Sequence, residues 1–126
     1  MSKRSKLSDA NFEIMRVIWD LGEATVNEIH SAVNAKRDDG IKRESVQVQV
    51  KRLEKYGWLK RRKRGKVYHY SALADRDETM RDILEDVKDR VFGGSRAELV
   101  RCLFESSEIS EAELVRIRRL LDTKTE

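Results

Sequence analysis

Basic side chains are concentrated in one part of this 126-residue chain, where they could bind phosphate groups. Residues 42–66 contain eleven lysines and arginines against two acidic residues, a net charge of +9, although the whole chain carries only +4. The flanking segments are slightly acidic, with net charges of −1 for residues 1–41 and −4 for residues 67–126. Lysine and arginine at this density neutralise nucleic-acid phosphates, whereas a segment that needs only solubility usually mixes both signs of charge. The clustering predicts a nucleic-acid partner, with a merely solvated basic segment as the alternative.

Residues suited to catalysis or metal binding are sparse. The two histidines, His30 and His69, fall in different predicted elements, and Cys102 is the single cysteine. These three cannot complete a tetrahedral zinc site without carboxylates, and neither a glycine-rich phosphate loop nor a Ser/His/Asp arrangement is present. We interpret His30 as a surface or backbone-contacting residue and Cys102 as a small residue of a helix core. The sequence predicts a protein that is not an enzyme and that uses no cofactor.

Composition also bears on the cellular compartment. A single cysteine allows no internal disulfide, which fits a reducing cytoplasm. Residues 1–10 lack the apolar region of a signal peptide, and no apolar run approaches membrane-spanning length. We therefore expect a cytoplasmic protein with no stable membrane association.

A helix followed by a hairpin carries the basic cluster. Val46, Val50 and Leu53 recur at i, i+4 and i+7, which predicts the buried stripe of a helix that ends at Gly57. Residues 60–64 are five consecutive cations. A turn at residues 64–65 then separates them from a second run rich in strand-forming residues. This order is typical of a winged helix-turn-helix protein that binds DNA.

Helix-capping patterns predict the remaining elements. Ser8 precedes a first helix at residues 8–21, and the capping box at residues 25–28 opens a second. After residue 73 the apolar spacing returns to 3.6 and predicts a helix at residues 75–92. Capping boxes at Ser95 and Ser110 each open a further short helix.

The predicted fold is mainly α, with a winged helix-turn-helix domain at residues 1–73, including a two-stranded wing, and a three-helix dimerisation region at residues 74–126. About fifty residues are too few to bury much of their own apolar surface, so a second copy of the chain is the expected partner. The residues expected at the dimer interface are Met80, Ile83, Leu84, Val87, Leu114, Ile117 and Leu121.

The helix after residue 42 is expected to lie in the major groove and to present its first residues to base edges. Glu44 could accept from cytosine, Val48 could touch a thymine methyl, and Arg52 could bind guanine, with Ser45 and Gln49 beside them. The alternatives are an ion pair of Arg52 with Glu54 or a neighbouring helix, and burial of Val48 against the second helix. The full set of predicted DNA-binding residues is Arg43, Glu44, Ser45, Val48, Gln49, Lys51, Arg52, Lys55, Arg61, Arg62, Lys63, Arg64 and Lys66.

Most of the cations, Lys60 included, are expected to contact phosphate or the minor groove, which positions the protein without reading much sequence. Tyr68 and Tyr70 alternate with His69 on the second strand of the wing. We interpret both tyrosines as core packing under the hairpin, with stacking on bases as the alternative.

Four segments resemble the BlaI/MecI family of bacterial penicillinase repressors: L-S-D-A-N-F-E-I-M-R-V-I-W, S-V-Q-V-Q-V-K-R-L-E-K-Y-G, R-G-K-V-Y-H-Y and F-E-S-S-E-I-S-E-A-E-L. The resemblance implies a homodimer that binds an inverted-repeat operator and blocks transcription. It also implies inactivation by proteolysis through a membrane sensor with a metalloprotease domain. The family's scissile bond, commonly Asn-Phe, corresponds to Cys102 and Leu103 here.

The chain departs from this family at the start of the reading helix. Residues 42–45 are Lys-Arg-Glu-Ser where relatives often have Ser-Pro-Lys-Thr, and Val48 stands where threonine is common. The operator sequence therefore does not transfer. Copper-responsive members of the wider family carry paired cysteines near the C-terminus, and a single cysteine argues against metal sensing.

Two other classes compete with this interpretation. A ligand-sensing regulator of the MarR type would need an apolar pocket between its reading and dimerisation modules. A winged-helix module that binds protein or RNA would also tolerate a basic wing.

Overall fold

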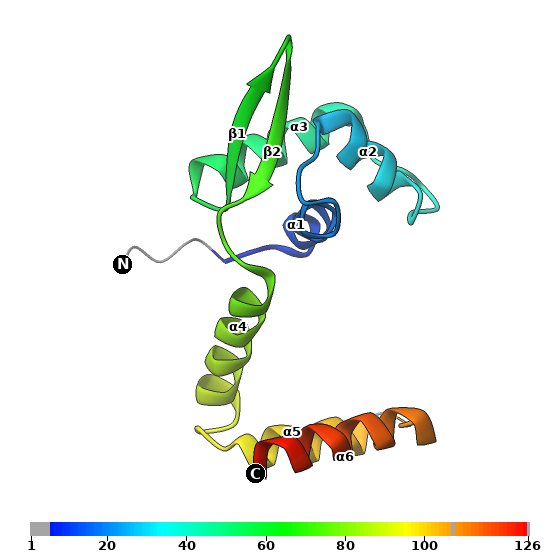
Figure 1. Cartoon of the computed structure of the whole chain (residues 1–126), viewed down its shortest axis with the longest axis vertical. Coiled ribbons are helices and arrows are strands. Elements are labelled where there is room, and N and C mark those ends of the chain that lie inside the picture. The colour runs from blue at the N-terminus through cyan, green and yellow to red at the C-terminus, as the bar shows by residue number, and fades with distance from the viewer. Residues whose placement is uncertain (1–5, 107, 126) are drawn as a thin grey trace. The chain divides into compact units, whose positions relative to one another are not determined.

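The computed structural model describes residues 6–106 and 108–125. In chain order the elements are α1 (Asp9–Leu21), α2 (Val26–Asn34), α3 (Arg43–Lys55), β1 (Leu59–Arg64), β2 (Val67–Ala72), α4 (Arg76–Val91), α5 (Arg96–Ser106) and α6 (Glu111–Thr125) (Figure 1). The predicted fold, mainly helical with a two-stranded wing, is confirmed. The chain divides into two compact units that meet between Thr79 and Met80, and the domain boundary after residue 73 stays a prediction.

Side-chain caps fix the first two helices. Ser8 is the N-cap of α1, and its Oγ accepts from the backbone N–H of Asn11 at 3.2 Å. Thr25 and Glu28 form a complete capping box at the start of α2, with distances of 3.1 and 2.9 Å. Each cap satisfies backbone N–H groups that a helix start leaves without partners. The capping pattern therefore located both helix starts from the sequence to within one residue.

The core of the first unit lies between the three helices and the base of the hairpin. The apolar residues of α3 that the sequence assigned to its buried stripe are all inside this core, as predicted. The side chains that are almost completely buried there are Ile14, Met15, Ile18, Ile29, Leu53, Leu59, Val46 and Val50. Burial of each such side chain favours folding by about 1.5–3 kcal/mol, so this core fixes α3 firmly against α1 and α2.

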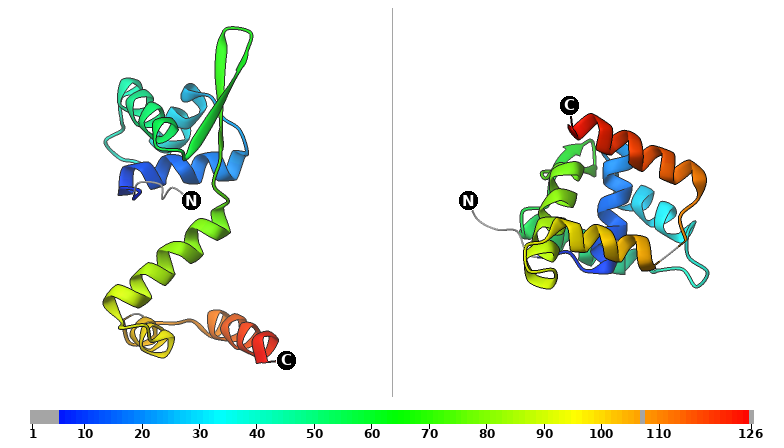
Figure 2. Two further views of the ribbon diagram at one scale, coloured as in Figure 1. Left: turned by 90° about the vertical axis from the view of Figure 1, so that its left-hand side faces the viewer. Right: turned by 90° about the horizontal axis from the view of Figure 1, so that it is seen from below.

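An isolated β-bridge joins the hairpin to the loop between α1 and α2. β1 and β2 pair antiparallel from Leu59 opposite Ala72 to Arg64 opposite Val67, and Gly65 takes a positive φ of 61° at the turn. In the loop between α1 and α2, Ala24 pairs with Tyr70 of β2 through two backbone hydrogen bonds of 2.9 and 2.8 Å. The base of the hairpin is therefore anchored, while its tip extends beyond the helices of this unit (Figure 2).

Ion pairs organise the end of α4 and the turn after it. Lys88 donates to Glu85 at 2.6 Å and lies 3.3 Å from Asp89, and Arg96 at the start of α5 contacts Glu85 at 3.1 Å. The hydrogen bond to Glu85 raises the pKa of Lys88, so the lysine stays charged although its side chain is largely covered. Ser95 and Ser110 cap α5 and α6 through the N–H groups of Glu98 and Glu113.

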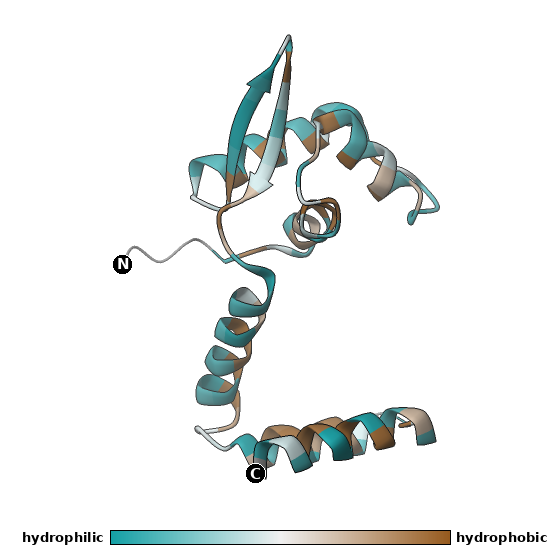
Figure 3. Cartoon of the chain, in the orientation of Figure 1, coloured by the Kyte–Doolittle hydropathy of each residue, from teal (hydrophilic) through white to brown (hydrophobic). Residues whose placement is uncertain are grey.

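Many apolar side chains of the second unit are exposed in the single chain. Figure 3 shows hydrophobic positions in brown along the ribbons of α4, α5 and α6. Cys102 is exposed, so its interpretation as a core residue is wrong for the single chain. Leu103 is 58% exposed and Phe104 is also exposed. The apolar residues predicted on α4–α6 are thus exposed or half-buried, and they form an apolar surface on the single chain.

Among the described residues, no helix is both long and apolar enough to cross a membrane.

Candidate DNA-binding surface

The exposed side of α3 carries the residues predicted to read bases. Val48 is 56% exposed at the middle of the helix, and Glu44 and Ser45 in the first turn are also exposed. Lys51, Arg52 and Lys55 continue the same side toward the end of the helix. The alternative that Val48 is buried against the second helix is wrong, because at 100° per residue it lies opposite the core stripe.

Two other predicted DNA-binding residues of α3 are partly engaged within the protein itself. Arg43 Nε donates to Asn27 Oδ1 on α2, which ties the start of α3 to the second helix. Gln49 is half-buried, and its Oε1 is buried without a hydrogen-bond partner in the described structure. Their assignment as DNA-binding residues stays a prediction.

The ion pair between Arg52 and Glu54, the alternative role for Arg52, is not formed among the described residues. Glu54 instead contacts Arg61 Nε of β1 at 3.2 Å. Arg52 is exposed, and no ion pair of its guanidinium is seen within the described part of the chain. Its side chain is therefore available to a ligand on the same side as Val48.

The hairpin presents different side chains on its two faces. Cross-strand pairing places Arg61 opposite Tyr70 and Lys63 opposite Tyr68 on one face. On the other face Arg62 lies opposite His69 and Arg64 opposite Val67. All six cations from Lys60 to Lys66 are exposed, so the wing is basic on both faces.

All three arginines of the wing have anionic partners within the protein. Arg62 Nη2 lies 3.2 Å from Glu23 Oε2, and Arg64 Nη2 lies 3.6 Å from Glu23 Oε1. His69 Nδ1 lies 3.4 Å from the same oxygen. Arg61 pairs with Glu54, as described above. The sequence pattern did not predict that Glu23 and Glu54 pair with the wing, because both ion pairs are tertiary contacts.

The three lysines of the wing differ from its arginines. Lys60, Lys63 and Lys66 are exposed, and within the described residues none of them takes part in an ion pair. Lys63 Nζ lies 5.8 Å from the centre of the Tyr68 ring, and Arg61 Cζ lies 4.4 Å from it. The wing's uncompensated charge therefore resides mainly on its lysines.

The two tyrosines of β2 have different environments. Tyr70 is 4% exposed, which confirms its interpretation as core packing under the hairpin. Tyr68 is 39% exposed toward the tip, with Arg61 and Lys63 against its ring, so the same interpretation is wrong for it. Cation–π contact with these side chains holds the ring on the surface of the wing.

His30 contacts the backbone, as expected. Its Nε2 lies 2.7 Å from the carbonyl oxygen of Ile41, and Asn34 Oδ1 accepts from the N–H of Ile41 at 2.6 Å. These contacts fix the loop that leads into α3.

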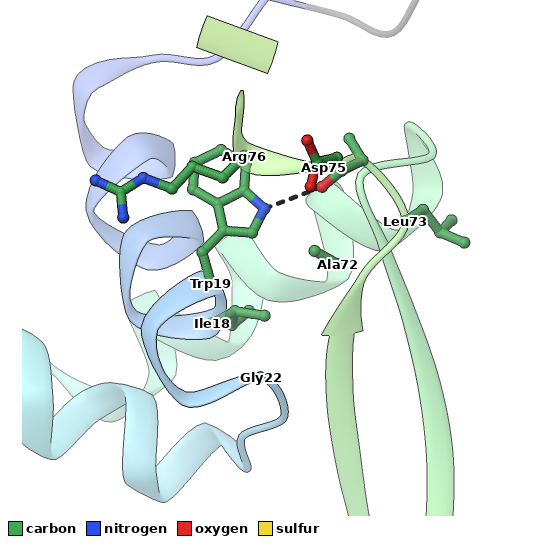
Figure 4. A pocket seen from close by; sticks show the side chains of 8 residues that line it. Ile18, Trp19, Gly22, Ala72, Leu73, Asp75 and Arg76 are labelled. Atoms are coloured by element: carbon green, nitrogen blue, oxygen red, sulfur yellow. Dashed lines mark hydrogen bonds between the residues drawn. The ribbon is translucent and has the colours of Figure 1, made fainter. Parts of the chain in front are cut away.

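A shallow hollow lies where β2 leads into α4 (Figure 4). Trp19 Nε1 donates to the carbonyl oxygen of Ala74 at 3.0 Å, which places the indole ring beside the chain that leaves the wing. Arg76 lies 3.9 Å from Asp20 at its rim. The hollow is open to solvent.

A core of three helices, an anchored basic hairpin and an exposed polar side of α3 together define a winged helix-turn-helix DNA-binding protein. The chain belongs to the penicillinase repressor family, because the family model described as penicillinase repressor matches residues 7–123. The predicted relationship to BlaI and MecI is thereby confirmed, and the protein is a transcriptional repressor of that family.

Known relatives agree with this assignment. The chain is 26% identical to the methicillin resistance regulatory protein MecI of Mammaliicoccus sciuri over 123 residues, which cover 98% of each chain. It is 29% identical to the solved DNA-binding domain of the repressor BlaI, with a TM-score of 0.53, covering 62% of this chain and 93% of that one. It matches the monomeric form of Bacillus licheniformis BlaI in complex with the blaP half-operator at 29% identity and a TM-score of 0.52, again covering 62% and 93%.

Proposed function

We propose that the protein is a cytoplasmic homodimeric repressor that binds a palindromic operator through α3 and the basic wing. The observation that carries this proposal is the exposed side of α3, with Val48 at its centre and lysines and arginines on the same structural unit. Relatives of the family include a BlaI bound to a half-operator, which supports the same mode of binding here.

Base reading is assigned to the first turns of α3. Glu44, Ser45 and Val48 would lie against base edges in the major groove, and Arg52 would reach a guanine at the margin. Lys51, Lys55 and the wing cations would neutralise phosphates on either side. This division of roles predicts that helix variants change sequence preference, whereas wing variants weaken binding to all duplexes.

Dimerisation is assigned to the helices that follow the wing. Met80, Ile83, Leu84 and Leu121 are exposed in the single chain, whereas Val87, Leu114 and Ile117 are half-buried. An apolar surface on a small helical unit is stable in water when a second copy covers it. Two reading helices related by a two-fold axis then require half-sites about one helical turn, or a multiple of it, apart.

Inactivation by proteolysis is proposed from the family resemblance. The bond between Cys102 and Leu103 lies inside α5, and both of these side chains are exposed in the single chain. A protease needs an extended substrate, so this helix must open locally before cleavage. A membrane sensor with a metalloprotease domain would start the process, and loss of the residues after the cut would weaken the dimer.

To test the proposed function, duplexes are selected from a random-sequence pool with the full-length protein. The protein is then footprinted on the selected duplex. We expect an inverted repeat with both half-sites protected. A selected site without two-fold symmetry would contradict the dimeric mode, and no enrichment over the starting pool would contradict sequence-specific binding. Release of the selected duplex by small aromatic compounds would favour the ligand-sensing alternative.

A further inference from the structure

Glu23 is held beside the wing by the backbone. The neighbouring residue, Ala24, pairs with Tyr70 through two hydrogen bonds, and both of these side chains are buried. Because side chains alternate along a strand, Glu23 must point to the other face of the hairpin, where Arg62 and His69 lie. The backbone bridge therefore places the carboxylate of Glu23 next to the basic side chains of the wing.

The carboxylate of Glu23 lies close to three basic side chains of the wing. Both of its oxygens lie near Arg62 Nη2, at 3.2 and 3.5 Å, while Arg64 and His69 approach Oε1. The side chain of Glu23 is 31% exposed, whereas those of Arg62 and Arg64 are 59% and 58% exposed. The arginines are thus accessible to a second anion, while the carboxylate is partly shielded from water.

A DNA phosphate and this carboxylate offer the same chemistry to a guanidinium. Both are anions with oxygen acceptors that take charge-assisted hydrogen bonds from arginine. A phosphate that bound Arg62 would approach Glu23 closely, and the two negative charges would repel each other. Binding of DNA to this face of the wing must therefore either displace Glu23 or tolerate it.

We propose that Glu23 is an internal counter-ion of the wing that competes with DNA phosphate for Arg62 and Arg64. This role rests on the proposed DNA-binding function. Glu23 limits the affinity of the wing for duplexes of any sequence, which leaves specificity to the exposed side of α3. The hairpin itself does not depend on Glu23 for its position, because the backbone pair between Ala24 and Tyr70 anchors it.

The test compares the full-length protein with Glu23→Gln by equilibrium binding to a mixed-sequence duplex over a range of salt concentrations. We expect Glu23→Gln to bind about threefold tighter or more at low salt, in the range of a single exposed ion pair. The salt dependence should also steepen by about 0.9 in log–log slope per chain, because one more phosphate is neutralised. Asp38→Asn is the matched control, since it makes the same charge change at an exposed position in the loop before α3. It should produce a clearly smaller change in both quantities.

A second background separates the counter-ion role from a general effect of charge. In a protein that carries Arg62→Gln and Arg64→Gln, adding Glu23→Gln should improve binding no more than adding Asp38→Asn does. An equal gain in both backgrounds would overturn the proposal. Unchanged or weaker binding by Glu23→Gln alone would overturn it as well, and weaker binding would show that Glu23 orients the wing.

A readout without DNA distinguishes this proposal from the function on which it rests. Arginine side-chain signals in NMR spectra of the free protein should shift for Arg62 when Glu23 becomes Gln, and should not shift with Asp38→Asn. Wild-type protein that bound no duplex at any salt concentration would contradict the DNA-binding function and the competition together. Normal wild-type binding with no response to Glu23→Gln would contradict the counter-ion role alone.

Discussion

Val48 and Val50 are two residues apart in α3 and face opposite ways: Val48 is 56% exposed, whereas Val50 is completely buried. Two steps of 100° turn the helix by more than half a circle, so two nearby valines of the same chemistry have different environments. Val50 packs in the core with Val46 and Leu53, and Val48 lies at the centre of the exposed side that we propose reads bases. This difference allows function and stability to be tested separately with two substitutions in one helix.

Val48→Asp is expected to abolish preference for the operator without destabilising the protein. A carboxylate at this position repels phosphate and cannot make the apolar contact that valine offers to a thymine methyl. Val50→Ala, the matched substitution on the buried side, should lower the free energy of unfolding by about 1–3 kcal/mol. Binding titrations with selected and mixed-sequence duplexes, together with urea unfolding, measure both effects. Equal loss by Val48→Asp on both duplexes would show that α3 is not the reader.

The wing lysines should dominate the salt dependence of binding. If the cations of a dimer neutralise roughly six to ten phosphates, affinity falls by about 10³ or more between 50 and 200 mM salt. Replacing Lys60, Lys63 and Lys66 by alanine should weaken binding to all duplexes alike and flatten the log–log slope by up to about 2.7 per chain. Replacing Arg61 and Arg62 should act in the same direction but less per charge, because both are paired within the protein.

A control for the wing lysines is the triple alanine variant of Lys6, Lys36 and Lys124, which removes the same charge from exposed positions elsewhere. It should leave the slope nearly unchanged. A slope that fell equally in both triple variants would mean that net charge, and not the wing, governs binding.

The dimer interface can be tested with single charges on α6. Leu121→Asp places a carboxylate on the apolar side of α6 with Leu114 and Ile117, and should shift the protein to monomers and weaken operator binding through loss of bivalent engagement. Ala112→Asp adds the same charge on the opposite side of the helix and should leave the dimer intact. Analytical ultracentrifugation decides between the two outcomes. A dimer that persisted in Leu121→Asp would place the interface elsewhere.

Periodic patterns predicted the parts of this fold that depend on local spacing. The stripe of Val46, Val50 and Leu53 and the capping box of Thr25 each involve residues within a few positions of one another, so the sequence alone contains them. The turn at Gly65 and the cations before it likewise define the wing. The exposed side of α3 follows directly, because it is the side opposite the buried stripe.

Environments that depend on distant segments were not predictable in the same way. Tyr68 and Tyr70 share one face of β2, yet Tyr70 is buried and Tyr68 is exposed, since helices cover only the base of the hairpin. Alternation identifies the face and not the length of strand that is covered. The partner of Arg62 comes from a loop 39 residues earlier in the chain, and no spacing rule connects the two. Cys102 lies on a helix whose apolar side is uncovered in one chain, so a single-chain core was the wrong expectation.

The ion pair between Glu13 and Arg37 predicts an acid-sensitive contribution to stability. Arg37 donates to the Glu13 carboxylate, which lowers the pKa of Glu13 below its usual 4.5. A depressed folded-state pKa stabilises the fold above the unfolded value, and this contribution is lost as the pH falls through the folded value. Arg37→Gln should therefore reduce the free energy of unfolding at pH 7, and the reduction should shrink below pH 4.5.

Urea unfolding of both proteins near neutral pH and in acid measures this difference. The effect should be modest, because both side chains are about one-third exposed and solvent screens the pair. Arg118→Gln, which removes an exposed arginine from α6, is the control and should show no such pH dependence. A reduction for Arg37→Gln that was equal at both pH values would exclude the ion pair as its cause.

Proteolysis at the bond between Cys102 and Leu103 should leave α1–α4 and the wing intact while removing α6 and the end of α5. The products would retain the reading side of α3 but lack Leu114, Ile117 and Leu121, so they should lose the dimer and release the operator by mass action. Mass spectrometry of the protein from cells in the induced state would detect both fragments. Cys102→Pro should disrupt α5 at this bond and so alter its cleavage, while the DNA-binding unit is unchanged. An intact 126-residue chain that accompanied full derepression would exclude cleavage and favour release by a ligand.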